Sequence, residues 1–285
     1  MADAAAPAKK KSGSKPDLAT IGGLILAIGG ILGGLVMEGG KVKDVAQVTA
    51  AIIVLAGTIG AVMVTTPMGT LIGAVKKLVL VFFAPDESPA AIIEEIIGYA
   101  AKARKSGIVS LENDANAIQD PFLRKALNLA VDGTDLDVIR KTMELQITLD
   151  EHHAEAEAKV FESAGGYAPT IGIIGAVLGL IQVMKNLANI EEVGHGIAVA
   201  FVATVYGVGT ANLFFLPAGN KIKVRMQKVT QTQELMLEGV AGIVEGLNPK
   251  LIRSKLEAYT LHEHSKKAAK GAPAAAGAQA APAAT

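Results

Sequence analysis

The chain contains no cysteine and no tryptophan, and only 4% of its 285 residues are aromatic. Without cysteine it can form neither disulfides nor thiolate metal sites, and it has no cysteine nucleophile. Charged residues are scarce as well, at 19% against roughly 25% in an ordinary soluble domain. Lysine plus arginine equals aspartate plus glutamate at 27 each, so the net charge is zero. This balance excludes a globally basic nucleic-acid-binding protein and a self-repelling disordered chain.

Aliphatic residues and glycine are abundant in place of aromatic and charged residues. Hydrophobic residues account for 51% of the chain, 31 residues are glycine, and the mean hydropathy is +0.40, all of which indicate a membrane protein. A helix needs about 20 apolar residues to cross a bilayer. Four stretches free of Asp, Glu, Lys and Arg are long enough: 18–37, 45–75, 163–184 and 193–220. The second and fourth exceed one crossing, so we expect them to tilt or to run past the bilayer.

Lysine and arginine predict the orientation of these four spans. Residues 1–17 carry four of them, 76–162 carry ten and 221–285 carry ten, whereas the connections 38–44 and 185–192 carry three together. The positive-inside rule therefore predicts that both termini and the long middle segment are cytoplasmic. A cleaved signal peptide is the alternative for the first span, but an apolar core of 20 residues is long for one.

The predicted fold is an all-α membrane protein with four transmembrane helices, a helical cytoplasmic insert between spans 2 and 3, and a cytoplasmic C-terminal helix. The expected segments are a disordered N-terminus (1–17), membrane helices 1 and 2 (18–75), the insert (76–162), membrane helices 3 and 4 (163–220), C-terminal helices (221–265) and a disordered tail (266–285).

Local signals in the insert predict where its helices begin and end. Pro89 after Ser88 and Pro121 after Asp120 are typical of a first helical turn, and Ser106-Gly107 and Asp132-Gly133 are typical of helix ends. We also expect Ser110 to cap a short turn, and Thr134 with Asp137 to form a capping box. From there a helix is expected to continue to about residue 161 and into the third span. Residues 222–247 have the apolar spacing of another helix with one buried face.

The spans contain no carboxylate, lysine or arginine, and His195 is their one ionisable residue. Intramembrane charge usually marks an ion pathway, so any titrating group for ion passage must come from a partner. Threonines in the spans have an ordinary structural interpretation as hydroxyl bonds to the helix backbone, and prolines have one as kinks or helix starts. Gly172, Gly175 and Gly179, and a second set between residues 22 and 34, predict close helix packing. His152, His153, His262 and His264 lack a third ligand at metal-binding spacing, and no P-loop, serine-hydrolase or zinc-protease motif is present.

Four segments resemble the MotA/PomA family, the membrane subunit of the flagellar motor stator. They are GYAPTIGIIGAVLGL at 166–180, AFVATVYG at 200–207 followed by Pro217, ARKSGIVSLE at 103–112 and NPK at 248–250. One departure is Gly209, where the family pattern has a bulky aliphatic residue. The resemblance covers about residues 17–260, and the four charge-free stretches agree with it independently.

The resemblance implies a ring, understood as five copies, around a dimer of a MotB-like partner whose transmembrane Asp binds the ion. Ion flow across the inner membrane of a bacterium would then turn the ring against the rotor protein FliG. By the same resemblance Arg104 and Glu112 match the main rotor-contact charges, and Lys105 and Lys250 match secondary ones. The channel and coupling residues are Pro169, Thr170, Ala176, Thr204, Tyr206 and Pro217. Asn113 stands where some relatives carry a second acid.

The resemblance also implies H⁺ as the coupling ion rather than Na⁺. Sodium-type relatives have threonines at the positions of Ala176 and Thr204, and Na⁺ must exchange its hydration shell for oxygen ligands. Ala176 supplies no oxygen, and a proton needs only the partner's carboxylate. No cofactor is expected.

Three alternatives remain open. Arg104 can be a solvated surface charge, and Glu112 a helix-start carboxylate favoured by the helix dipole. The chain can be an ExbB- or TolQ-like energiser of outer-membrane transport, although such proteins generally have three spans. It can also be a passive helical scaffold without ion coupling.

Overall fold

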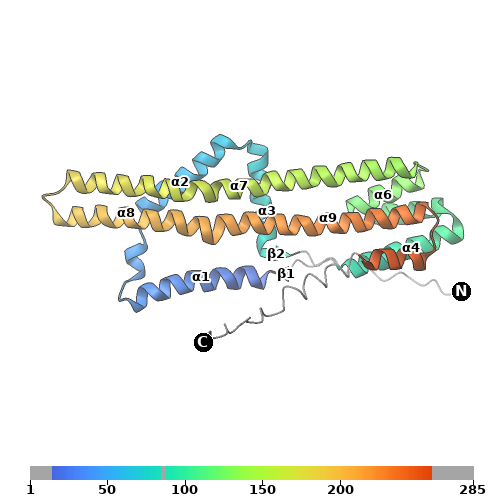
Figure 1. Ribbon diagram of the computed structural model, residues 1–285, viewed down its shortest axis with the longest axis horizontal. Helices are drawn as coiled ribbons and strands as arrows, with labels where there is room; N and C mark the ends of the chain where they lie inside the picture. The colour runs from blue at the N-terminus through green and yellow to red at the C-terminus, as the bar shows by residue number, and fades with distance from the viewer. Residues whose placement is uncertain (1–14, 85–87, 259–285) are drawn as a thin grey trace, which may run out of the picture. The chain divides into compact units, whose positions relative to one another are not determined.

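The computed structural model describes residues 15–84 and 88–258, and these residues form an almost entirely helical protein (Figure 1). The predicted all-α membrane fold is confirmed. The tail predicted to be disordered at 266–285, and all but three residues of the one at 1–17, lie outside the described residues. The main helices are α1 (Leu18–Met37), α2 (Val48–Thr65), α3 (Met68–Phe82), α4 (Pro89–Ser106), α5 (Glu112–Ala117), α6 (Pro121–Val131), α7 (Leu136–Lys185), α8 (Ile190–Thr210) and α9 (Leu216–Val244).

Shorter elements complete the described part of the chain. They are two 3₁₀ turns, η1 (Val42–Val45) and η2 (Ile108–Leu111), a π-helical turn, η3 (Ala211–Phe215), a last helix over residues 249–258, and two two-residue strands, β1 (Lys15–Pro16) and β2 (Phe83–Ala84). The strands pair antiparallel, with Lys15 opposite Ala84 and Pro16 opposite Phe83.

The chain divides into two compact units. The membrane unit comprises residues 1–87 and 146–230, and the second unit comprises 88–145 and 231–285, so that α7 and α9 each contribute to both. Within the described residues, four helical stretches are long and apolar enough to cross a bilayer: Leu18–Met37, Val48–Thr65, and parts of Leu136–Lys185 and Ile190–Val244. The chain is therefore a multi-pass membrane protein.

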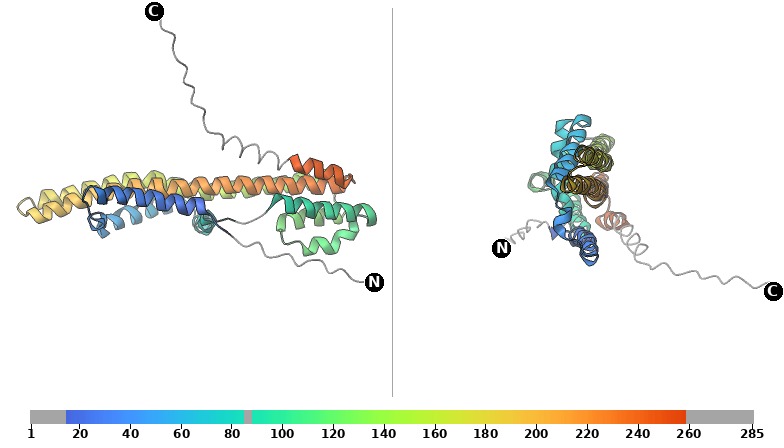
Figure 2. Two further views of the ribbon diagram at one scale, coloured as in Figure 1. Left: turned by 90° about the horizontal axis from the view of Figure 1, so that it is seen from below. Right: turned by 90° about the vertical axis from the view of Figure 1, so that its left-hand side faces the viewer.

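The second charge-free stretch does not form one long helix as the sequence had suggested. Helix α2 ends at Thr65, Thr66 is extended (φ −129°, ψ 132°), and α3 begins at Met68. Pro67 causes the break, because its ring disfavours a helical conformation at the preceding residue and it has no N–H to donate. Helix α3 then lies across α7 and α9 in Figure 1, and the right-hand view of Figure 2 shows α3 running past the two long helices, which are seen end-on.

The fourth charge-free stretch and the predicted C-terminal helix are one continuous helix, because the backbone stays helical through Pro217. In the π-helical turn η3 the N–H of Leu216 donates to the carbonyl of Ala211, five residues earlier. This wider turn accommodates a proline ring that would otherwise collide with the carbonyl four residues before it. Helices α8 and α9 therefore form one run from residue 190 to 244, where two separate helices were expected. Helix α7 likewise continues through Pro169, as predicted.

The core of the membrane unit lies where α3 crosses α7 and α9. Val81 of α3, Phe161 of α7 and Ile222 of α9 are buried there, and Val62 of α2 joins them. A separate small cluster joins α2 to α8 through Val54, Val199 and neighbouring residues. By contrast, none of the residues of α1 is buried.

The second unit confirms most of the predicted helix ends. Pro89 and Pro121 open α4 and α6, and the carboxylate of Asp120 accepts the N–H of Leu123 at 2.8 Å. Gly107 ends α4 at φ 81°, a backbone conformation that glycine adopts without strain.

Two predicted caps in the same unit are wrong. Ser110 lies inside η2, and its hydroxyl donates to the carbonyl of Gly107 rather than capping a helix. The cap of α7 is Asp135, whose carboxylate accepts the N–H of Asp137, so the pair Thr134 and Asp137 forms no capping box. An aspartate next to a threonine offers two possible cap positions, and the sequence pattern did not distinguish them.

Candidate functional site

Helices α7 and α8 of the membrane unit are in close backbone contact along glycines. A Cβ placed on Gly207 would lie 2.5 Å from the carbonyl oxygen of Ala168 and 3.0 Å from Cα of Gly172. One on Gly179 would lie 2.7 Å from the carbonyl oxygen of Gly196. Because such distances exclude any side chain, the two backbones touch directly. The prediction for Gly172, Gly175 and Gly179 is confirmed, and we call this contact the α7–α8 seam.

The six glycines of α1 behave differently. A Cβ on Gly22, Gly23, Gly29, Gly30, Gly33 or Gly34 would meet no atom within 4 Å among the described residues. None of the helices that the structure describes uses these glycines for close packing.

Several of the predicted channel residues meet at the seam. A Cβ on Gly207 would lie 3.2 Å from Cα of Pro169, and one on Gly172 would lie 3.5 Å from Cα of Thr204. The Thr170 hydroxyl donates to the carbonyl of Tyr167 at 2.8 Å, and that of Thr204 donates to the carbonyl of Ala200 at 3.3 Å. The ordinary interpretation of these threonines is thus confirmed, although both hydroxyls keep lone pairs that can accept a bond or bind a cation. Ala176 is half-buried one residue beyond Gly175.

Tyr206 connects the seam to the start of α2. Its hydroxyl donates to the carbonyl of Val45 at 2.6 Å and accepts the N–H of Gln47 at 3.3 Å. These two backbone groups belong to the irregular turn before α2, which must have hydrogen-bond partners wherever lipid replaces water. Tyr206 therefore holds the α1–α2 connection against α8.

Pro217 lies away from the seam, on the other side of η3, and the sequence analysis missed its neighbour Asn212. The Asn212 amide donates to the carbonyl of Val208 at 2.9 Å, and the Thr210 hydroxyl donates to that of Tyr206 at 2.6 Å. Both side chains stabilise carbonyls next to the π-helical turn, where regular helix bonds are displaced. The sequence did contain a signal for this role of Asn212, because an asparagine stands five residues before a proline in a charge-free span.

A cluster of ion pairs joins the start of α1 to α9 and was not predicted either. The Asp17 carboxylate caps α1 and lies 2.6 Å from Nζ of Lys221 and 2.8 Å from the Arg225 guanidinium. The hydrogen bond from Lys221 is the main reason that the pKa of Asp17 falls to about 2. Arg225 also donates to the carbonyl of Phe83 at 2.9 Å. One guanidinium thus fastens the start of α1 and the β1–β2 pair to α9.

The predicted rotor-contact charges all lie on the surface of the second unit. Arg104 and Lys105 occupy the last turn of α4, Glu112 is the first residue of α5, and Lys250 is in the first turn of the helix over 249–258. All four are exposed, and none makes a side-chain ion pair within the described part of the chain. The Lys250 N–H donates to the side chain of Asn248 at 3.0 Å, which explains the Asn-Pro element as a helix cap.

The charges around them are paired. Lys102 binds Asp114 at 2.5 Å, Arg253 binds Glu94, and Lys255 and Arg140 bind Glu238. Arg104 also borders a hollow of about 280 Å³ that is lined by the ends of α4, α6 and α9, including Gly133 and Gly246. The four predicted residues are therefore available to bind something outside the unit, which is what a rotor contact requires.

Comparison with known proteins shows which family has this architecture. Residues 114–235 match the model of the MotA/TolQ/ExbB proton channel family. Motility protein A of Bacillus subtilis is 37% identical over 247 residues, which are 85% of this chain and 90% of that protein. The chain belongs to the MotA/PomA family. Among solved structures, MotAB of C. jejuni superposes with a TM-score of 0.81 at 34% identity, covering 85% of this chain and 95% of that one. The MotAB stator complex of Bacillus subtilis gives 0.78 at the same identity and coverage.

Membership of the MotA/PomA family explains the fold, but it does not by itself assign a role to each residue. No side chain of the seam in this MotA-family chain is a carboxylate, lysine or arginine. At Gly209, where the family pattern has a bulky residue, a Cβ would meet no atom within 4 Å among the described residues, so the pattern does not conflict with the packing of this chain. The roles of the rotor and channel residues stay predictions.

Proposed function

We propose that this protein is the ring-forming stator subunit of a bacterial flagellar motor, in which H⁺ flow across the inner membrane turns a pentamer against FliG. The observation that carries the proposal is the structural match to MotAB stators over 95% of their chains at 34% identity. Both termini and the second unit lie in the cytoplasm in this proposal, in line with the distribution of lysine and arginine.

The ion-binding group comes from a MotB-like dimer inside the ring. The spans of this chain offer hydroxyls and backbone carbonyls at the α7–α8 seam but no acid. Thr170, Thr204 and the half-buried Ala176 lie on the two helices of that seam. A partner Asp placed beside the seam completes the pathway.

A flux measurement tests the need for that partner. Vesicles that contain only this protein should show background H⁺ flux, because the spans have no titrating carboxylate. Vesicles that contain it with a MotB-like partner should conduct, and replacing the partner's transmembrane Asp by Asn should abolish the flux. Robust conduction by this chain alone would contradict the proposal.

Charge reversal tests the rotor contact. Arg104→Glu or Glu112→Lys should each slow swimming, and the double variant should slow it more, while membrane insertion stays normal. An exposed charge contact is worth up to about 1 kcal/mol, roughly fivefold in affinity, and weakens with salt. Arg124→Glu is the matched control, since Arg124 is also an exposed arginine of the second unit without an ion pair in the described chain. Normal swimming of the Arg104→Ala/Glu112→Ala variant would show that these residues are wrongly assigned.

Ion substitution tests the coupling ion. Swimming or rotation speed should not change when external Na⁺ is replaced by K⁺ at constant membrane potential, and it should collapse when a protonophore is added. The reason is that Ala176 gives Na⁺ no oxygen ligand, whereas a proton binds to the carboxylate alone. Speed that follows external Na⁺ and survives the protonophore would overturn the assignment to H⁺.

A further inference from the structure

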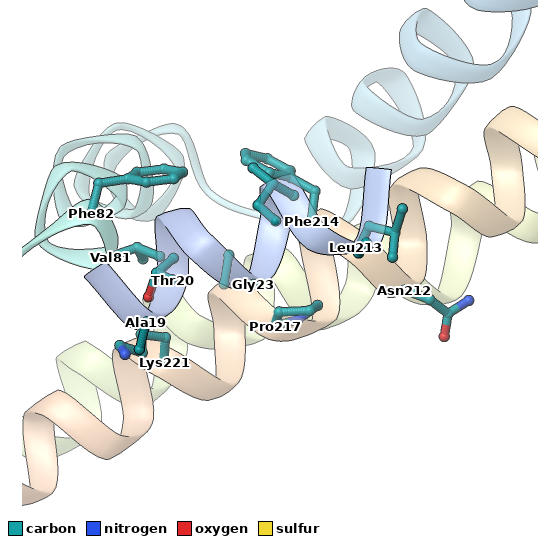
Figure 3. Close-up of a pocket in the computed structure, with 13 residues that line it drawn as sticks. Ala19, Thr20, Gly23, Val81, Phe82, Asn212, Leu213, Phe214, Pro217 and Lys221 are labelled. Carbon is teal, nitrogen blue, oxygen red and sulfur yellow. The ribbon is translucent and has the colours of Figure 1, made fainter. Parts of the chain in front are cut away.

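A pocket of about 310 Å³ lies between the first half of α1, the end of α3 and the start of α9 (Figure 3). Its walls are mostly apolar, with Leu24 on α1, Phe82 on α3 and Phe214 of η3. On the outer side of α1, Ile25 and Leu26 are 66% and 77% exposed. Because α1 is one of the four candidate spans, this surface of α1 and the pocket beside it lie at the depth of the acyl chains.

One end of the pocket carries excess positive charge. Lys221 lines it, and its Nζ lies 2.6 Å from the carboxylate of Asp17. Arg225 binds the same carboxylate at 2.8 Å, so that one anion faces two cations. The Nε of Arg225 is buried and has no hydrogen-bond partner among the described residues. This end of the pocket is next to the first residue of α1, where the span leaves the bilayer.

The dimensions of the pocket select its occupant. It extends along α1 from Ala19 to Ala27, a length of about 12 Å at 1.5 Å per residue. That length is less than half of the roughly 30 Å hydrocarbon core, so the pocket lies within one leaflet. The pocket holds about 310 Å³, whereas a helix segment of the same length, about 10–12 Å across, would occupy roughly 900–1,400 Å³. The pocket therefore suits a single hydrocarbon chain better than a helix of a second copy.

We propose that the pocket binds an anionic phospholipid of this leaflet, with one acyl chain between α1 and α9 and the phosphate at Lys221. Basic side chains at the membrane surface attract anionic headgroups, with about 1 kcal/mol per lysine or arginine. The lipid stabilises α1, which the chain itself leaves without a single buried residue. Asn212 and Pro217 line the same pocket, so the acyl chain also contacts the π-helical turn.

Photo-crosslinking tests this site. The full chain is placed in vesicles of phosphatidylcholine with a small fraction of phosphatidylglycerol that carries a photoreactive group on one acyl chain, and the adducts are mapped by mass spectrometry. Adducts should concentrate at residues 19–27 and 212–218. Lys221→Gln should lower their yield several-fold, Lys221→Arg should restore it, and labelled phosphatidylcholine should respond to neither change.

Two glycines provide a matched pair of variants. Gly23 lines the pocket and Gly22 does not, although a Cβ on either would meet no atom within 4 Å among the described residues. Gly23→Leu should therefore abolish the adducts by filling the pocket, and Gly22→Leu should leave them unchanged. Adducts spread evenly along α1, or equal yields from both variants, would overturn the proposal.

A disulfide experiment tests whether a second copy of the chain, rather than a lipid, occupies the pocket. The chain has no native cysteine, so Gly23→Cys introduces a single thiol. Under oxidation this variant should stay uncrosslinked in the assembled protein. Efficient disulfide formation between two copies of the Gly23→Cys variant would show that a second copy occupies this position, and would overturn the lipid assignment.

Discussion

Replacing Gly207 by valine should abolish motility and destabilise the membrane unit by about 3 kcal/mol, the upper range for an overpacked core. The new Cβ would lie 2.5 Å from the carbonyl oxygen of Ala168 and 3.2 Å from Cα of Pro169. These are backbone atoms, so no rotamer change can make room, and α8 must move away from α7. The measurement is swimming speed together with the thermal unfolding midpoint of the purified protein in detergent, followed by circular dichroism.

Gly209→Val is the control for this substitution. Gly209 belongs to the same helix two residues further on, and a Cβ there would meet no atom within 4 Å among the described residues. This variant should swim and melt like the parent protein. Equal damage from both variants would mean that helix propensity, rather than contact at the seam, explains the effect.

Replacing Arg225 by glutamine should lower the unfolding midpoint by roughly 6–10 °C, which corresponds to about 3 kcal/mol at this chain length. The guanidinium is 15% exposed, and it bonds Asp17 and the carbonyls of Phe83 and Val81. A glutamine side chain cannot reach all three acceptors. The partly buried Asp17 carboxylate and the carbonyls of Phe83 and Val81 therefore lose a hydrogen-bond donor, which destabilises the folded state. We expect residues 15–20 to become sensitive to protease at the same time.

Lys223→Gln is the control, because it removes a more exposed ion pair from the same helix. Lys223 lies on the same helix and pairs with Glu162 at 2.7 Å, but its side chain is 38% exposed. An ion pair with that exposure contributes little to stability, because solvent screens it. If both variants melt at the same temperature, the Arg225 cluster does not fasten α1 to α9.

The sequence predicted the helices and their types because the signals are local. Ser88-Pro89 and Asp120-Pro121 start helices wherever they occur in such a context, and charge-free stretches of 20 residues predict membrane spans directly. The same reasoning could not decide what Pro67 and Pro217 do. At Pro67 the preceding residue becomes extended and the helix ends. At Pro217 a wide turn and the side chains of Asn212 and Thr210 preserve the helix.

The functional residues were predicted only in part, for a related reason. The glycines of the seam have a short repeat on one helix, so their packing role was visible in the sequence. Arg225 and Asp17 are 208 residues apart, and no periodicity connects two residues at that separation. Tyr206 appeared in a family motif, but its bonds to Val45 and Gln47 depend on how α2 returns to α8. Such partners follow from tertiary packing alone.

The crosswise helix α3 has a mechanical consequence. One side of it packs into the protein through Ala74 and Val81, while an opposite stripe remains exposed: Met68, Ile72, Val75, Val79 and Leu80. A helix that lies across two membrane-spanning helices (Figure 1) and carries an exposed apolar stripe has the pattern of an interfacial helix, whose apolar side is buried in lipid. Drawing it into water would cost about 1.5–3 kcal/mol for each large side chain. The cost of exposing these side chains therefore opposes any movement that would lift α3 out of the lipid.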